Sequence, residues 1–289
     1  MNVLMSYHYE KRPEFYLSLV DSGMNVLVDS GAFSADRIGA QIDVDDYAKM
    51  LKEVDGKVAG YFTLDVMRNP EASKEQHAYL RSLGLRPIPV YQNTSLNFSD
   101  VEEFLDGEDY VAIGSLVKSP HIDKTSGFNE IRISEFLRIQ RQVAPEVKVH
   151  LLGYVRKTTI KEFAPYSVDS IGRRPDMFGG PLLVYDGGTW LRIPYPDRGK
   201  VKQLSRGDLK TAARIAKLYG ITTWKNLPTD FWRGLGITGY MRWSRKIAAE
   251  GGTLIYSAVI PGDLTESVLP MAVRLGWIKE DAPCLKFLK

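Results

Sequence analysis

The chain has almost no cysteine, since Cys284 is the only one among 289 residues. A disulfide within the chain is therefore impossible, and a cysteine-based zinc or iron–sulfur site lacks its ligands. The four histidines, His8, His77, His121 and His150, show no metal-ligand spacing. We interpret each of them as an ordinary surface or core residue. The sequence leads us to expect no metal and no other cofactor.

Long apolar runs and targeting patterns are also missing. No stretch approaches the roughly 18 apolar residues of a membrane span, and the N-terminus has neither the basic region nor the apolar segment of a secretory signal. We therefore expect no membrane partner and a cytoplasmic location. With 289 residues, 44% of them hydrophobic, the chain is long enough for an α/β barrel or for two smaller domains.

Charge is unevenly distributed along the chain. The net charge is +3, but residues 191–250 hold 13 Lys or Arg against 4 Asp or Glu, which leaves the rest of the chain at −6. All five tryptophans lie in the C-terminal part, at Trp190, Trp224, Trp232, Trp243 and Trp277. Basic side chains among aromatic ones suit a phosphate backbone and unstacked bases. A solvated basic face around a small core gives the same composition.

Short apolar runs alternate with helical patterns over the first 170 residues, which is typical of βαβ units. The predicted strands are residues 3–7, 25–29, 58–65, 86–91, 110–115, 147–152 and 166–169. Pro87 and Pro89 make the fourth strand unusual, because proline cannot donate to a ladder. The pattern predicts an α/β fold, a (β/α)8 TIM-like barrel that can be irregular.

After residue 170 this alternation ends. Residues 182–191 predict a β-hairpin with an Asp-Gly turn. A helix is predicted from Asp208, as its N-cap, to Gly220, and a second one over 238–250. The first carries Lys210, Arg214 and Lys217 beside an apolar stripe of Leu209, Ala213 and Ala216, and the second carries Arg242, Arg245 and Lys246.

A strand at 253–260 and a helix at 264–275 follow these two helices, so the eighth βα unit is expected after a helical insertion. We divide the chain accordingly into three parts. Residues 1–195 form the catalytic barrel core, residues 196–251 a basic, aromatic-bearing helical insertion for nucleic acid, and residues 252–289 the last strand and helix of the barrel.

Acids and small residues follow several predicted strands. The second ends at Asp29-Ser30-Gly31, the third at Asp65, and the seventh at Asp169. Because the loops after parallel strands converge on one face of a barrel, we expect these carboxylates to meet. One carboxylate can attack the anomeric carbon of a sugar while a second handles the leaving-group proton, and a third can accept paired N–H groups of a purine. Taken singly, each acid is better explained as a helix cap that follows a strand.

As an ordered set, these residues resemble the tRNA-guanine transglycosylases. They resemble more closely the phage and bacterial relatives that place 7-deazaguanines in DNA, the DpdA family. The resemblance implies that Asp169 is the nucleophile and Asp29 the general acid/base. It implies a base pocket formed by Phe33, Asp65, Gln92, Gly114, Ser115, Leu116, Leu152 and Gly153. Alanine at position 32 and serine at position 115 depart from the glycines of the family.

The resemblance implies an enzyme that exchanges guanine in DNA for a 7-deazaguanine, with 7-cyano-7-deazaguanine as the first choice, through a covalent aspartyl-glycosyl intermediate. Its partners are DNA and the free base, and it needs no cofactor. Nucleic-acid contacts are predicted for Arg173, Arg174, Lys210, Arg214, Lys217, Arg242, Arg245 and Lys246.

DNA is favoured over tRNA because the tRNA enzymes share a zinc site with three cysteines, which this chain cannot form. Three alternatives stay open. They are a tRNA-guanine transglycosylase, a barrel hydrolase of nucleosides or glycosides, and a non-catalytic protein that binds guanine or nucleic acid.

Overall fold

The computed structural model describes residues 1–66, 69–92, 96–116, 128–171, 182–193, 205–222, 229–250 and 252–288. Within these ranges it contains strands and helices that alternate along the first half of the chain. In chain order they are β1 (Asn2–Ser6), α1 (Pro13–Asp21), β2 (Asn25–Asp29), α2 (Ala32–Arg37), α3 (Val44–Val54), β3 (Gly60–Tyr61), α4 (Pro70–Ser82), β4 (Val90–Tyr91), α5 (Val101–Leu105), β5 (Tyr110–Ile113), α6 (Phe128–Val143), β6 (Lys148–Leu151), α7 (Lys157–Phe163) and β7 (Ser167–Ile171).

The second half departs from this alternation. It contains β8 (Leu182–Asp186), β9 (Thr189–Ile193), α9 (Arg206–Tyr219), α10 (Thr229–Ala249), β10 (Leu254–Ala258), α11 (Pro261–Asp263), a π-helical turn (Leu264–Val268), α12 (Leu269–Arg274) and a 3₁₀ helix (Pro283–Phe287). No helix of the described ranges is long and apolar enough to cross a membrane.

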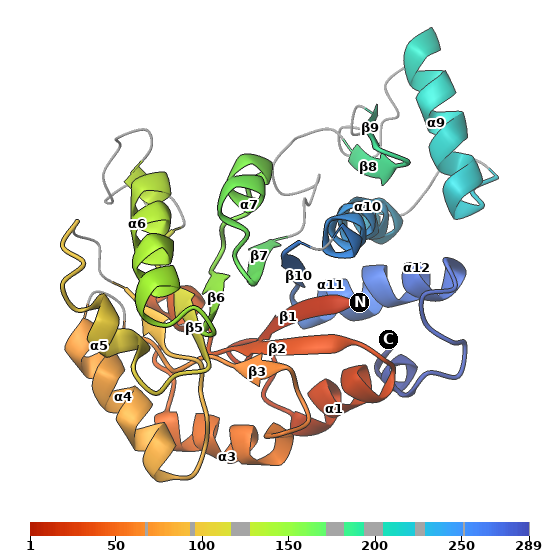
Figure 1. Cartoon of the computed structure of the whole chain (residues 1–289). Helices are drawn as coiled ribbons and strands as arrows, with labels where there is room; N and C mark the ends of the chain where they lie inside the picture. Colours follow the sequence, from red (N-terminus) through yellow and green to blue (C-terminus); the bar gives the residue numbers. More distant parts are fainter. Residues whose placement is uncertain are drawn as a thin grey trace.

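The main sheet has eight parallel strands in the order β3-β2-β1-β10-β7-β6-β5-β4. It is curled, and helices lie around its outside (Figure 1). Strand β10 lies between β7 and β1, although the hairpin and helices α9 and α10 separate it from β7 in the chain. The predicted α/β class is confirmed.

The edge strands β3 and β4 are much shorter than predicted. They form no ladder with each other, although Phe62 and Ile88 make one isolated parallel bridge. The Ile88 amide donates to the Tyr61 carbonyl at 2.7 Å, and the Ile88 carbonyl accepts from Thr63 at 2.9 Å. The prolines on both sides of Ile88 have no N–H group, so the pairing cannot extend. The sheet is therefore curled but open, and the closed barrel stays a prediction.

Side chains alternate between the two faces of the curled sheet. Val3, Val26 and Val28 pack outward against the helices in one core cluster. Leu4 and Leu27 belong instead to a cluster on the concave face, which draws its members from strands all around the sheet. Those members are Leu4, Leu27, Phe62, Ile88, Val90, Ala112 and Tyr256. By the same period of two, the last residue of β2 and the third residue of β7 are also on the concave face.

The predicted hairpin is confirmed, and it packs with α9 and α10 around a separate apolar cluster. Two details of α9 differ from prediction. Ser205 is the N-cap, and Asp208 completes a capping box three residues later. The buried face is formed by Ala212, Ile215 and Tyr219, whereas Leu209 is 56% exposed. The first error places the helix start three residues too late, and the second selects a different helix face from the one that packs against the hairpin.

Helix α10 begins at Thr229, nine residues before the predicted start. Glycine has a low intrinsic preference for a helix. In this fold, however, two glycines of α10 permit close packing. A Cβ on Gly234 would lie 2.5 Å from the Ser267 carbonyl oxygen, and one on Gly239 would lie 2.8 Å from the Leu183 carbonyl oxygen. Tertiary contacts therefore override the local preference, because α10 approaches β8 and the π-helical turn at backbone distance.

Candidate active site

Asp29 is the last residue of β2, and Gly31 turns the chain behind it. The Gly31 amide donates to Asp29 Oδ2 at 3.1 Å. Gly31 has a φ of 82°, and a Cβ there would lie 2.3 Å from Ser6 Oγ and 2.4 Å from His8 Cβ. Both the backbone conformation and the packing therefore require glycine. Ala32 is the first residue of helix α2, a position that suits alanine.

The electrostatic surroundings of Asp29 favour its protonated form. Burial, followed by the negative charge of Asp169, raises the pKa of Asp29 to about 7, while hydrogen bonds from the backbone of Gly31 and Ser30 act in the opposite direction. A carboxyl group with such a pKa can give and take protons near neutral pH. Asp29, at the end of β2, and Asp169, the third residue of β7, both lie on the concave face of the sheet.

Asp169 lies on β7 and is 5% exposed. Its Oδ1 accepts one hydrogen bond from the Gly153 amide at 2.7 Å and one from His150 Nε2 at 3.1 Å. Gly153 has a φ of 66°, which favours glycine. His150 is fully buried, so its interpretation as a core histidine is confirmed. Its contact with Asp169 was not predicted, because nothing in the sequence pairs positions 150 and 169.

Asp65 and Gln92 follow β3 and β4 and come together beside Gly114. Burial raises the pKa of Asp65 to about 8; a side-chain hydrogen bond with Gln92 opposes this shift, and the charge of Asp29 adds to it. Among the described residues no group forms a hydrogen bond with the buried Asp65 Oδ1, so this oxygen can accept a donor from a ligand. A Cβ on Gly114 would lie 3.5 Å from Gln92 Cγ, which shows how closely β5 approaches Gln92.

The loop after β5 is held from behind by helix α6. Arg132, which is 1% exposed, donates to the Ser115 carbonyl at 3.2 Å and to the Gly114 carbonyl at 3.4 Å. Asn129 Nδ2 donates to the Leu116 carbonyl at 2.8 Å. Ser115 has a φ of 54°, the left-handed conformation that favours glycine, although it is a serine. Arg132 was not predicted, since a buried arginine looks like any other charged helix residue in sequence.

The remaining predicted base-pocket residues lie in different surroundings. Phe33 is 43% exposed, with the Arg37 guanidinium 5.9 Å from its ring centre. Leu152 is partly buried against the concave-face cluster. The Leu116 side chain is 3% exposed and packs in the core cluster between the sheet and helix α6, so only the Leu116 backbone can face the predicted base pocket. Arg173 and Arg174 lie outside the described residues.

The predicted nucleic-acid surface on α9 and α10 is partly neutralised by its own neighbours. Arg214 Nε lies 2.5 Å from Asp186 Oδ2, and Arg242 approaches the same carboxylate at 4.0 Å. Lys246 pairs with Glu250 at 3.5 Å. Each of these basic side chains therefore has a structural role as well as a predicted binding role.

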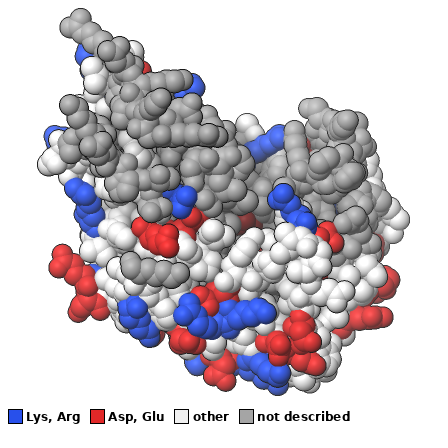
Figure 2. Space-filling model, turned by 180° about the vertical axis from the view of Figure 1, so that it is seen from behind, with Lys and Arg blue, Asp and Glu red and all other residues white. Residues whose placement is uncertain are grey.

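Arg245 stacks on Trp277 at 4.7 Å. Lys210 and Lys217 are exposed and make no ion pair within the described ranges. Of the described tryptophans, Trp190 is the most exposed, at 39%, and it packs against Trp243 with ring centres 6.0 Å apart. Figure 2 shows the face of the molecule opposite to Figure 1, where basic and acidic side chains alternate over the described surface.

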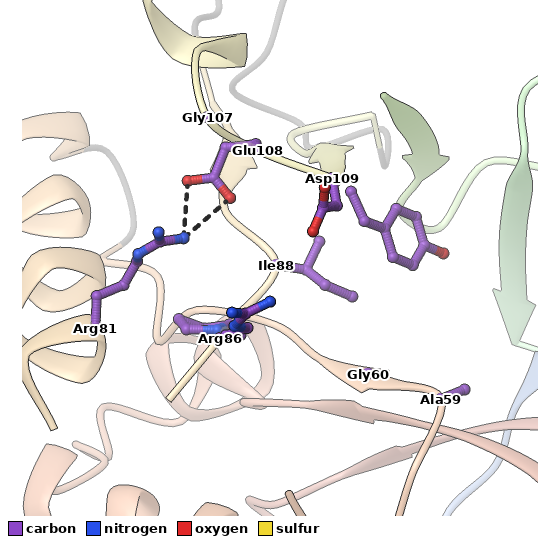
Figure 3. Close-up of a pocket in the computed structure, with 10 residues that line it drawn as sticks. Ala59, Gly60, Arg81, Arg86, Ile88, Gly107, Glu108 and Asp109 are labelled. Atoms are coloured by element: carbon purple, nitrogen blue, oxygen red, sulfur yellow. Dashed lines mark hydrogen bonds and ion pairs between the residues drawn. The ribbon is translucent and has the colours of Figure 1, made fainter. Parts of the chain in front are cut away.

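A pocket of about 270 Å³ lies at the opposite end of the sheet, where β3 and β5 begin. Figure 3 shows Arg81 and Arg86 facing Glu108 and Asp109 across it, with Arg81 and Glu108 paired at 3.4 Å. The amino ends of strands in such folds serve stability, whereas sites form at the carboxyl ends. None of the predicted site residues lines this pocket.

Comparison of the sequence with models of protein families and with curated proteins finds no match to either. Within the described ranges, no group of three or more histidine, cysteine, aspartate or glutamate side chains is placed to hold a metal ion. The geometry of the three aspartates and their hydrogen-bond partners is therefore the basis for assigning a function.

Proposed function

We propose that this protein is a transglycosylase that exchanges guanine in DNA for a 7-deazaguanine through a covalent bond to Asp169. The observation that carries the proposal is that Asp29, at the end of β2, and Asp169, on β7, lie on the same concave face, where Asp65 also has a buried oxygen without a hydrogen-bond partner within the described ranges. Two acids with different environments suit the roles of general acid and nucleophile. The third offers an acceptor for the N–H groups of a guanine edge. 7-Cyano-7-deazaguanine is the proposed incoming base.

In the first step, the guanosine is extruded from the nucleic acid into the pocket. A carboxylate oxygen of Asp169 attacks C1′, the C1′–N9 bond breaks, and its electron pair passes to the departing guanine. Asp29, protonated near neutral pH because of its raised pKa, gives its proton to that base. The product is an ester between Asp169 and the sugar, together with free guanine.

In the second step, the 7-deazaguanine occupies the same pocket. Ionised Asp29 removes its N9 proton, and N9 attacks C1′ while the electron pair of the ester bond returns to the Asp169 carboxylate. Two displacements at C1′ retain its configuration. One glycosidic bond replaces another, so the exchange needs no external source of energy or electrons.

Asp65, Gln92 and the backbone of Gly114 and Ser115 form the proposed base-reading group. Guanine binding would bring N–H donors to Asp65 Oδ1, which has no hydrogen-bond partner in the described part of the chain. Because such donors stabilise the charged form, the pKa of Asp65 falls when the base binds. Stacking of the base between Phe33 and Leu152 completes the proposed pocket.

The architecture proposed for this enzyme is an irregular (β/α)8 barrel, with residues 196–251 as the nucleic-acid-binding insertion. The order of the eight parallel strands and the concave-face cluster, which joins residues from both edges of the sheet, support it. Lys210 and Lys217 are the cations best placed to meet a phosphate backbone, since they have no acid partner within the described ranges.

The test uses purified protein, 7-cyano-7-deazaguanine and guanine-containing duplex DNA of varied sequence, with tRNA in a parallel reaction. The nucleic acid is digested to nucleosides and analysed by mass spectrometry. We expect a modified deoxynucleoside with the wild type and none with Asp169→Asn. Asp109→Asn is the matched control, because this carboxylate is exposed at the opposite end of the sheet.

Modification of tRNA alone would change the proposed substrate and leave the mechanism intact. Absence of product from both nucleic acids, with protein shown to be folded, would overturn the proposal.

The paired cations of α9 and α10 favour a second candidate, a hydrolase of small nucleosides, because a small substrate needs no nucleic-acid surface. In that reaction water, activated by Asp29, would resolve the ester at Asp169. Release of guanine from guanosine or deoxyguanosine, without incorporation of an added base, would distinguish it from exchange.

A further inference from the structure

A chain of hydrogen bonds crosses the concave face and ends on Asp169. The Tyr110 hydroxyl lies 2.5 Å from Ser167 Oγ, Ser167 Oγ lies 2.6 Å from His150 Nδ1, and His150 Nε2 lies 3.1 Å from Asp169 Oδ1. These residues come from the adjacent strands β5, β6 and β7, with His150 opposite Ser167 in the register. Their side chains share one face because strand residues alternate.

The chemistry of the chain fixes the direction of its protons when the histidine is neutral. An ionised carboxylate accepts only, so His150 Nε2 carries the proton that bonds Asp169. His150 Nδ1 is then an acceptor for the Ser167 hydroxyl, and Ser167 accepts in turn from Tyr110. Burial raises the pKa of Tyr110 well above its usual value, which keeps this phenol a donor. Each group therefore fixes the orientation of the next.

The two oxygens of Asp169 differ in their surroundings. Oδ1 accepts from both His150 Nε2 and the Gly153 amide, at 3.1 and 2.7 Å. Within the described ranges no group donates to Oδ2. Two donors on one oxygen hold the carboxylate plane in place and leave the other oxygen free to react.

We infer that His150 is a positioning residue, which holds Asp169 Oδ1 so that Oδ2 attacks C1′. The inference rests on the proposed function, because it assigns a role within that reaction. During attack Oδ2 becomes the ester oxygen and Oδ1 the carbonyl oxygen. When the ester breaks, its electron pair returns to Asp169, and the bonds from His150 and Gly153 stabilise the carboxylate that leaves.

This arrangement makes a specific prediction for the two steps. Hydrogen bonds to a carboxylate stabilise its charged form, so their loss makes Asp169 a poorer leaving group. His150→Leu should slow exchange by about 10–100-fold through kcat, with little change in KM. Formation of the covalent DNA adduct and its breakdown by the incoming base should both slow, and quenched single-turnover reactions measure the two steps separately. His150→Gln, whose amide can place a donor near the Nε2 position, should restore part of both.

The experiment measures exchange and adduct together, by mass spectrometry of nucleosides and of denatured protein. Tyr256→Phe is the control. The Tyr256 ring packs 6.2 Å from the His150 ring, but its hydroxyl bonds to Asn25 rather than to this chain. Rates of adduct formation and breakdown in folded His150→Leu that equal those of the wild type, or that are lowered equally in His150→Leu and His150→Gln, would overturn the positioning role.

A second measurement is independent of activity. Nitrogen-15 spectra of the histidine rings should show His150 with its proton on Nε2, and Asp169→Asn should shift that resonance. If the wild type performs no exchange but the shift is present, the hydrogen-bond arrangement stands and the proposed function has failed. A proton on Nδ1 in the wild type would contradict the inference itself.

Discussion

Charged side chains are arranged differently in two regions of this molecule. At the carboxyl ends of the strands, Asp29 and Asp169 lie on the concave face, and burial together with the charge of Asp169 raises the pKa of Asp29 to about 7. Around α9 and α10, Arg214 and Arg242 share the carboxylate of Asp186. Charge that is gathered without compensation costs free energy and so indicates function, whereas paired charge is sufficiently explained by structure.

The sharpest test of this comparison removes one acid from each region. Asp169→Asn should lower exchange by about 10⁴-fold or more, because an amide does not form the glycosyl ester. Asp186→Asn should leave exchange within a few-fold, since Asp186 lies on the hairpin. Exchange assays and thermal denaturation of both proteins measure the two effects side by side.

The same pair of variants should differ in stability. Asp186→Asn leaves Arg214 and Arg242 without their acid partner, a loss of about 0.5–1 kcal/mol at these partly exposed positions. Loss of exchange in Asp186→Asn without loss of stability would contradict this comparison, because it would place the reacting groups near the hairpin and not at the carboxyl ends of the strands.

The second prediction concerns pH. The first step needs protonated Asp29, and burial with the charge of Asp169 raises its pKa to about 7. Single-turnover base release should therefore fall by about tenfold per pH unit above about 7. In Asp29→Asn this pH dependence should disappear together with most of the rate. A wild-type profile that is flat from pH 6 to 9 would remove Asp29 as the acid.

The third prediction is a gain of stability at the site. Burial raises the pKa of Asp65 to about 8, so the folded protein keeps a proton that the unfolded chain releases above about pH 4. This makes stability fall as pH rises between about 4 and 8. Asp65→Asn should then be more stable than the wild type, by about 1–3 kcal/mol at pH 8 and by less at pH 5.

Denaturant titrations at both pH values measure this difference. Equal stability of Asp65→Asn and wild type at pH 8 would show that the buried Asp65 carboxylate does not lower the free energy of unfolding. Exchange by Asp65→Asn should fall by about 100-fold, because the amide no longer accepts the paired N–H groups of guanine.

The smallest expected effect belongs to the basic helices. Lys210 and Lys217 are exposed and have no acid partner in the described part of the chain. Replacing both with Gln should weaken DNA binding several-fold and reduce the slope of log affinity against log salt by about 1–2. Arg214→Gln should change the slope less, because Arg214 already pairs with Asp186. Identical slopes for all three proteins would remove α9 from the nucleic-acid surface.

Much of the fold can be predicted from local pattern. The strands that deliver Asp29 and Asp169 are found almost at their predicted bounds, because apolar runs followed by acids are local features. The short edge strands were not predicted, since Ile88 pairs across the sheet while the prolines on each side of it cannot. The start of α10 was missed because glycine disfavours a helix in sequence, whereas in the fold Gly234 allows close contact with the π-helical turn.

The candidate site was likewise predicted only in part. Convergence of the acids follows from strand order, but their partners come from long-range contacts. His150 on β6 contacts Asp169 on the adjacent strand β7. Arg132 on α6 donates to the carbonyl groups that follow β5. The pairing of Arg214 and Arg242 with Asp186 is also long-range, so these two arginines look more available to nucleic acid in sequence than they are in the fold.

The central claim is that Asp169 forms a covalent bond to the sugar while Asp29 handles the proton. The most direct measurement quenches a reaction of the protein with guanine-containing DNA, digests both polymers and maps the modified peptide by mass spectrometry. A deoxyribose adduct on the peptide that contains Asp169, absent in Asp169→Asn, is the predicted result. Base exchange with no adduct, or with an adduct on another residue, would contradict the account.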